Sequence, residues 1–144
     1  MIRQIVQIGN PALREIANVV EESQIASKQI QGLVDDLIET NGAGLASTQI
    51  AGPYRICVIE VNKNPRYPYK PDIPLTVLIN PKVTFLTEER INVYEGCLSV
   101  PNLRGRVDRC PEVLIEGLDR HGQSLSFIAK GISAGTFQHE LDHL

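Results

Sequence analysis

The chain has 144 residues, of which 42% are apolar and 22% are charged, and its formal net charge is −3. This composition excludes an extended disordered chain, and we expect residues 1–144 to form one domain with one core. The acidic balance argues against a dedicated nucleic-acid binder, and no apolar run approaches the roughly 18 residues that cross a bilayer. The N-terminus lacks a signal-peptide pattern and the three cysteines cannot all pair, so we expect reduced thiols and a cytoplasmic protein.

Helical patterns stand near both ends of the chain. Asn10 and Pro11 are typical of the cap and the first residue of a short helical turn. Residues 27–40 carry apolar side chains three and four positions apart, which predicts an amphipathic helix that ends at Asn41. A second helix is expected from about Ser133, as its cap, to the end of the chain.

Branched apolar runs between these helices predict strands. The expected strands cover residues 56–61, 75–79, 83–86, 91–94, 113–118 and 125–129. The four prolines between positions 62 and 74 predict an irregular surface segment, and residues 119–122 predict a hairpin turn. We therefore expect an α+β fold in which antiparallel sheets pack around the C-terminal helix, with a further helix near the N-terminus.

The C-terminal helix carries an H-E-x-x-H motif formed by His139, Glu140 and His143. Histidines four residues apart lie on one face of a helix, where both imidazoles can bind one metal ion. Glu140 follows the first of them, where its carboxylate can accept a proton from a water molecule on that ion. The motif specifies only three residues and also occurs by chance on solvated helices, so it needs support from the rest of the chain.

A catalytic metal site of this kind needs a third protein ligand, and it must lie upstream because only one residue follows the motif. His121 falls in a turn, Cys57 lies in a buried strand pattern, and Cys110 precedes a proline. Cys97 directly follows an expected strand and a glycine that lets another group approach the backbone, so we favour it. One thiolate with two imidazoles suits zinc, iron, cobalt or nickel.

A glycine-rich loop covers residues 42–49. It lacks the third glycine of a dinucleotide-binding fingerprint, and it follows a helix rather than a strand, which contradicts nucleotide binding. Such a loop can instead let backbone amides pair with an extended peptide, with Gln49 donating from its side-chain amide.

Taken together and in this order, residues 42–49, 95–99 and 138–143 resemble the three sequence motifs of the peptide deformylases. The resemblance implies a metal-dependent hydrolase that removes the formyl group from the N-terminal formyl-methionine of nascent polypeptides and releases formate. The implied partners are N-formyl-methionyl peptides, on nascent chains near the ribosome, with neither a specific nucleic acid nor a membrane.

The resemblance also assigns roles to residues of this chain. One divalent metal ion, Fe(II) in cells and replaceable by Zn, Ni or Co, would be bound by Cys97, His139 and His143. Glu140 would take a proton from the metal-bound water and pass it to the departing amine. The developing charge on the formyl oxygen would be stabilised by the metal, the Gln49 side-chain amide and the backbone N–H of Leu98.

Substrate-binding residues follow from the same resemblance. The backbone near Ala43 and Gly44 would pair with the peptide as an added strand, and Arg104 would contact the peptide or be simply exposed. Asp142 is expected to hold the helix or a ligand imidazole in place. The pocket for the methionine side chain would be lined from the terminal helix by Ile132, Gly135 and Thr136.

Two alternatives remain open at this point. The sequence ends one residue after His143, so we expect the last helical turn to fray, and a homologue that binds metal or formylated peptides without turnover is one alternative. The other is a peptidase that cuts internal peptide bonds, against which the missing downstream ligand and the presence of Cys97 both count.

Overall fold

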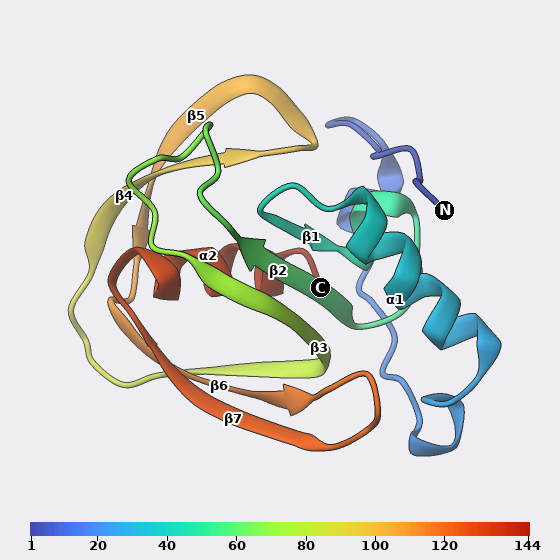
Figure 1. Cartoon of the computed structure of the whole chain (residues 1–144). Coiled ribbons are helices and arrows are strands. Elements are labelled where there is room, and N and C mark those ends of the chain that lie inside the picture. Colours follow the sequence, from blue (N-terminus) through green and yellow to red (C-terminus); the bar gives the residue numbers. More distant parts are fainter.

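The computed structural model describes residues 1–144 and shows two antiparallel sheets with helix α2 between them and helix α1 at one side (Figure 1). The helices are α1 (Lys28–Thr40) and α2 (Gly131–Asp142), and the short 3-10 helices are Pro11–Arg14, Glu22–Gln24 and Ser47–Ile50. The strands are β1 (Gly44–Ala46), β2 (Ile56–Val61), β3 (Ile73–Phe85), β4 (Ile91–Cys97), β5 (Val100–Arg109), β6 (Glu112–Leu118) and β7 (Ser124–Lys130). The expected α+β class is confirmed.

The larger sheet has five strands in the order β1-β2-β3-β6-β7, and β4 and β5 form a separate two-stranded sheet. Helix α2 contacts every strand of the larger sheet and also β5. Strand β1 pairs only with β2, so its other edge carries no neighbouring strand. This free edge lies beside α2, where the candidate site is found.

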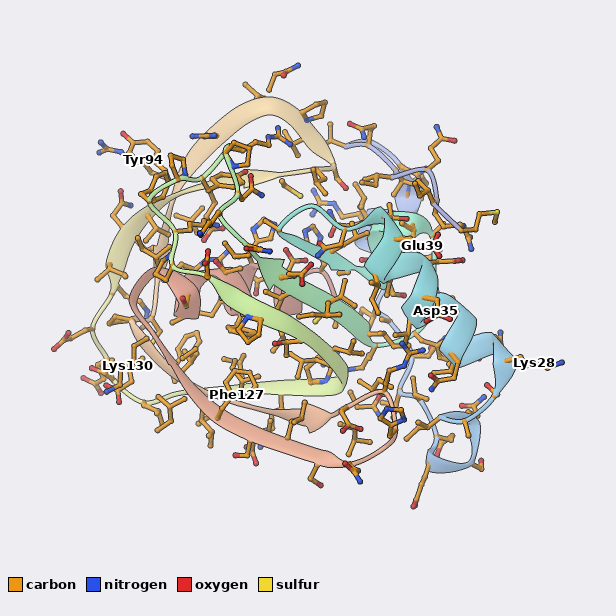
Figure 2. All side chains as sticks on the ribbon, viewed as in Figure 1. Lys28, Asp35, Glu39, Tyr94, Phe127 and Lys130 are labelled. Atoms are coloured by element: carbon orange, nitrogen blue, oxygen red, sulfur yellow. The ribbon has the colours of Figure 1, made fainter.

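Helix α1 forms as its sequence predicts. The hydroxyl of Ser27 caps the helix by accepting a hydrogen bond from the N–H of Ile30 at 3.2 Å. Ile30, Val34 and Leu37 of its apolar stripe are fully buried, and Leu33 and Ile38 are partly buried beside them. Lys28, Asp35 and Glu39 lie on the outer side of the helix, away from the sheet (Figure 2).

Strand β2 is buried on both faces because the two α-helices cover opposite sides of the sheet. Successive side chains of a strand alternate between faces. Cys57 and Ile59 belong to the apolar cluster that contains Phe137 of α2. Ile56 and Val58 belong to the cluster that contains the stripe of α1. The continuous apolar run of β2 is thus the pattern of a central strand.

Some predicted boundaries are wrong. The two strands expected at 75–79 and 83–86 are one strand, β3, which ends at Phe85 and has an irregular pairing with β6 around Asn80. Strand β5 was not predicted because it is mostly exposed and has no apolar alternation. Helix α2 begins at Gly131 rather than near Ser133, and no side chain caps its N-terminus.

We expect replacement of Asn80 by alanine to lower the free energy of unfolding by roughly 3 kcal/mol. Asn80 has a φ of +52°, and its side chain both accepts from the N–H of Val20 and donates to its carbonyl, each at 2.8 Å. Asn102 has a φ of +64° but is exposed and makes no side-chain hydrogen bond, so Asn102→Ala should cost only about 1 kcal/mol. Urea denaturation measures the free energy of unfolding of both variants. Equal decreases in the two variants would contradict the prediction.

Candidate active site

The end of β4 and the last two turns of α2 bring three metal-ligating side chains together. Cys97 Sγ lies 3.5 Å from His143 Nε2, which lies 3.3 Å from His139 Nε2, and the three ligand atoms lie within 4.8 Å of one another. A tetrahedral zinc site, with bonds of about 2.3 Å to sulfur and about 2.05 Å to nitrogen, separates sulfur from nitrogen by about 3.6 Å and the two nitrogens by about 3.3 Å. The two distances from His143 Nε2 match these values, so the three side chains can bind one tetrahedrally coordinated ion.

Charge also favours cation binding at these side chains. Burial alone would raise the pKa of Cys97, but hydrogen bonds with His139 and His143 lower it to about 5. Burial opposes the charged form of His139, yet hydrogen bonds with Cys97 and Glu95 raise its pKa to about 10. Protons and a divalent cation compete for these side chains, so binding of a metal ion here is expected to release protons.

A series of oppositely charged side chains holds the ring of His139 at Nδ1, the nitrogen that faces away from Cys97 and His143. Its Nδ1 donates to Glu95 Oε1 at 2.9 Å, and Arg109 donates two hydrogen bonds of 2.7 Å to the same carboxylate. Burial would raise the pKa of Glu95, but Arg109 and His139 lower it to about 2. Asp142, expected to hold the helix or an imidazole, accepts a hydrogen bond of 2.6 Å from Arg109 Nη1.

The sequence analysis assigned no role to Glu95 or Arg109. One signal for Glu95 was available, because it directly follows the expected strand 91–94 and precedes Cys97 by two residues, so both point to one face where the strand continues. Arg109 has no comparable signal, since its strand β5 was not predicted. In the sheet Arg109 pairs with Ile91, and its long side chain reaches along the sheet to the carboxylate of Glu95.

Glu140 is almost fully buried against the edge strand β1. Burial raises the pKa of its carboxyl group, and its Oε2 has no hydrogen-bond partner. A side chain at Gly44 would overlap this carboxylate, so the glycine permits the close approach of α2 to β1. A buried carboxylate oxygen without a partner, next to a set of metal ligands, is suited to receive a proton from a bound molecule.

Gln49 is held with its amide directed at the same place. Its Oε1 accepts from the N–H of Ala46 at 2.9 Å, and its Nε2 donates to Ser99 Oγ at 3.1 Å and to Cys97 Sγ at 3.4 Å. The side chain is 1% exposed, so its orientation is determined by these contacts. Leu98 follows Cys97 directly and lines the same cavity.

A cavity of about 440 Å³ lies over these groups. Its walls include most of the residues singled out in the sequence, namely Ala43, Gly44, Gln49, Cys97, Leu98, Arg104, Thr136, His139 and Glu140. Ile132 lines a neighbouring hollow, and Gly135 faces Val93 and Arg109 instead of the cavity. Arg66, Tyr67 and Lys70 also line the cavity, although the sequence indicated only that their segment is irregular.

Two hydrogen bonds hold the last turn of the chain. The hydroxyl of Thr48 donates to the carbonyl of His143 at 2.8 Å. The N–H of Ala17 donates to the carbonyl of Leu144 at 3.2 Å. These bonds satisfy carbonyl groups that have no partner within the helix, and they oppose the fraying expected from the sequence.

Comparison with known proteins decides the family. The model of the polypeptide deformylase family matches residues 2–144. Peptide deformylase 2 of Nostoc sp. is 44% identical over 144 residues, which cover 97% of this chain and 79% of that protein. This chain belongs to the peptide deformylase family. The deformylase resembles the Met-Ala-Ser-bound class I type b peptide deformylase of Acinetobacter baumannii, with a TM-score of 0.93, 32% identity and coverage of 100% of this chain and 93% of that one.

The deformylase of Thermotoga maritima has the same fold, with a TM-score of 0.85, 26% identity and coverage of 100% and 92% of the two chains. Members of the family are metal-dependent enzymes that deformylate N-formyl-methionyl peptides, and the function predicted from the sequence is confirmed. The non-catalytic alternative is not supported. No helix of this deformylase has the length and apolar character needed to span a membrane.

In the metal-free deformylase at about pH 6.5, we expect iodoacetamide to alkylate Cys97 and to spare Cys57 and Cys110. Cys97 is largely a thiolate above about pH 5, and its reactivity should fall as the pH is lowered through that value. The other two thiols are fully buried. Mass spectrometry of tryptic peptides measures the alkylation of each cysteine. In the control, Zn(II)-loaded protein, the bound metal should protect Cys97 from alkylation. Similar alkylation of all three cysteines in the folded protein would contradict it.

We expect Glu95→Gln to weaken metal binding by about ten- to a hundredfold, because His139 loses its charged hydrogen-bond partner. Asp142→Asn is the matched control, since Asp142 also contacts Arg109 but its side chain is 68% exposed and it does not touch His139. Its zinc affinity should stay within about threefold of the parent. Competition with a chromogenic zinc chelator measures both variants, and equal losses would argue against the role of Glu95.

Proposed function

We propose that Cys97, His139 and His143 hold one divalent metal ion, Fe(II) in cells, and that Glu140 is the general base for removal of the formyl group. The observation that carries the proposal is the tetrahedral spacing of these three ligand atoms beside the buried, unpartnered oxygen of Glu140. When bound, the ion supplies Lewis acidity, which polarises the formyl group and makes water a stronger nucleophile near neutral pH.

Glu140 moves the proton in this scheme. Its carboxylate accepts a proton from the water that attacks the formyl carbon. As the C–N bond breaks, Glu140 donates that proton to the amine nitrogen, and formate and a free N-terminus are released. The raised pKa of Glu140 brings its proton affinity closer to neutral pH, as both steps require.

Gln49 and Leu98 stabilise the charge that develops on the formyl oxygen. Without substrate, the amide of Gln49 is held by Ala46, Ser99 and Cys97. In the reaction we assign the N–H group that contacts Cys97 Sγ to the formyl oxygen, together with the backbone N–H of Leu98. Because the side chain is buried and its other two hydrogen bonds remain, only this one partner has to change.

The peptide itself binds along the free edge of β1. Ala43 and Gly44 line the cavity at that edge, so an extended peptide can pair with their backbone as an added strand. Thr136 lines the cavity and borders the place of the first side chain, whereas Ile132 and Gly135, expected beside it, face away from the cavity. Arg104 contacts the residues that follow.

We infer that residues 1–144 act as one catalytic domain in the cytoplasm, on nascent chains close to the ribosome. The continuous contact of α2 with both sheets supports a single unit.

Glu140→Gln should lower formate release from formyl-Met-Ala-Ser by at least about a hundredfold, while the metal content stays at that of the parent. The assay uses protein loaded with Fe(II) or Ni(II) under anaerobic conditions. Glu60→Gln is the control and should retain activity, because Glu60 is the one exposed residue of β2. Cys97→Ser should lose both metal and activity. Undiminished turnover by Glu140→Gln would refute its role, and cleavage inside unformylated peptides would favour the peptidase alternative.

A further inference from the structure

Three basic side chains line the catalytic cavity without an acidic partner. Arg66 and Lys70 come from the segment between β2 and β3, and Arg104 comes from β5. None of the three forms a salt bridge within the chain. The hydrogen bonds of Lys70 and Arg104 go to neutral oxygens. Lys70 Nζ contacts Thr136 Oγ1 at 3.4 Å, and Arg104 Nη2 donates to the carbonyl of Arg66 at 2.7 Å.

The ring of Tyr67 holds two of these cations close together. Lys70 Nζ lies 4.6 Å from the ring centroid, and the guanidinium carbon of Arg104 lies 4.8 Å from it. Cation–π attraction offsets part of the repulsion between the two like charges. A negative group bound in the cavity near both cations would remove the rest, because opposite charges in a partly buried site attract strongly.

The acidic residues that line the cavity do not neutralise these cations. There are two of them, Glu95 and Glu140. The charge of Glu95 is matched by the two hydrogen bonds from Arg109. Glu140 is buried, and the proposed reaction uses it as the base. The cavity therefore presents excess positive charge at its mouth, although the whole chain has a net charge of −3.

We propose that Arg66, Lys70 and Arg104 select N-formyl peptides that carry a carboxylate side chain at the second or third residue. The inference rests on the proposed function. Lys70 touches Thr136, which borders the place of the first side chain. Because an extended chain advances about 3.3 Å per residue, the next residues pass the cations. The cations line a concave cavity that also contains His139 and Glu140, which favours a single peptide strand over a nucleic acid.

The test compares three formylated peptides with amidated C-termini: formyl-Met-Ala-Ser, formyl-Met-Asp-Ser and formyl-Met-Ala-Asp. Amidation matters because a free C-terminal carboxylate would supply the anion in every peptide. At about 20 mM salt, the better acidic peptide should have a kcat/KM about tenfold above that of the neutral one, mainly through KM. At about 0.5 M salt, the advantage should fall below about twofold, because salt screens the attraction.

Substitutions test whether these side chains cause the preference for acidic peptides. The double variant Arg66→Gln/Lys70→Gln should lose most of the ratio between acidic and neutral peptides, and Lys70→Arg should keep it. Lys63→Gln is the matched control, because Lys63 is an exposed lysine of the same segment that does not line the cavity. This control should show the ratio of the parent.

Each other outcome overturns the inference. Equal kcat/KM for the three peptides at low salt, with formate released from all of them, overturns the charge preference and leaves the proposed function intact. An unchanged ratio in the double variant also overturns it. Competitive inhibition by a short single-stranded RNA without any preference among peptides would assign the cations to a nucleic acid instead. No formate from any peptide by the metal-loaded parent overturns both proposals.

Discussion

The site depends on keeping a thiol group, two imidazoles and a buried carboxylate close together. A series of hydrogen bonds between oppositely charged side chains stabilises this arrangement. Asp142, Arg109, Glu95, His139 and Cys97 form a continuous series of hydrogen-bonded groups of alternating sign. The series runs from the C-terminal helix through β5 and β4 back to the helix at His139, and it ends at Cys97 on β4. It therefore joins the two elements that carry the metal ligands while it balances their charge.

The layered arrangement explains why residues distant in sequence meet here. Helix α2 crosses the larger sheet on one face and faces β5 on the other side, so the edge strand β1, the end of β4 and the last turns of α2 border one cavity. Close contact is possible because Gly44 has no side chain opposite Glu140. The hydroxyl of Thr48 holds the same, C-terminal, end of the helix by donating to the carbonyl of His143. The cavity is thus lined both by the proposed catalytic residues and by the basic side chains Arg66, Lys70 and Arg104.

Elements with a local signal could be predicted from the sequence. The stripe of residues 27–40 gave the first helix, and the run of residues 56–61 matches β2 at both ends. Elements that depend on distant partners could not. The strand β5 is mostly exposed and is held by hydrogen bonds to β4, so its composition carries no periodicity. The bend at Asn80 lies within one continuous strand because β3 pairs with β2 on one side and β6 on the other.

The sequence by itself determined the face of the terminal helix that carries His139, Glu140 and His143, because their spacing follows from helix geometry. Its motifs, taken in order, also indicated the family. Only the tertiary structure decided which thiol joins the histidines. Cys57 and Cys110 are fully buried in the core, whereas Cys97 reaches the imidazoles. Likewise, the roles of Glu95, Arg109 and Lys70 depend on partners from other strands and from α2, and no local pattern records such long-range contacts.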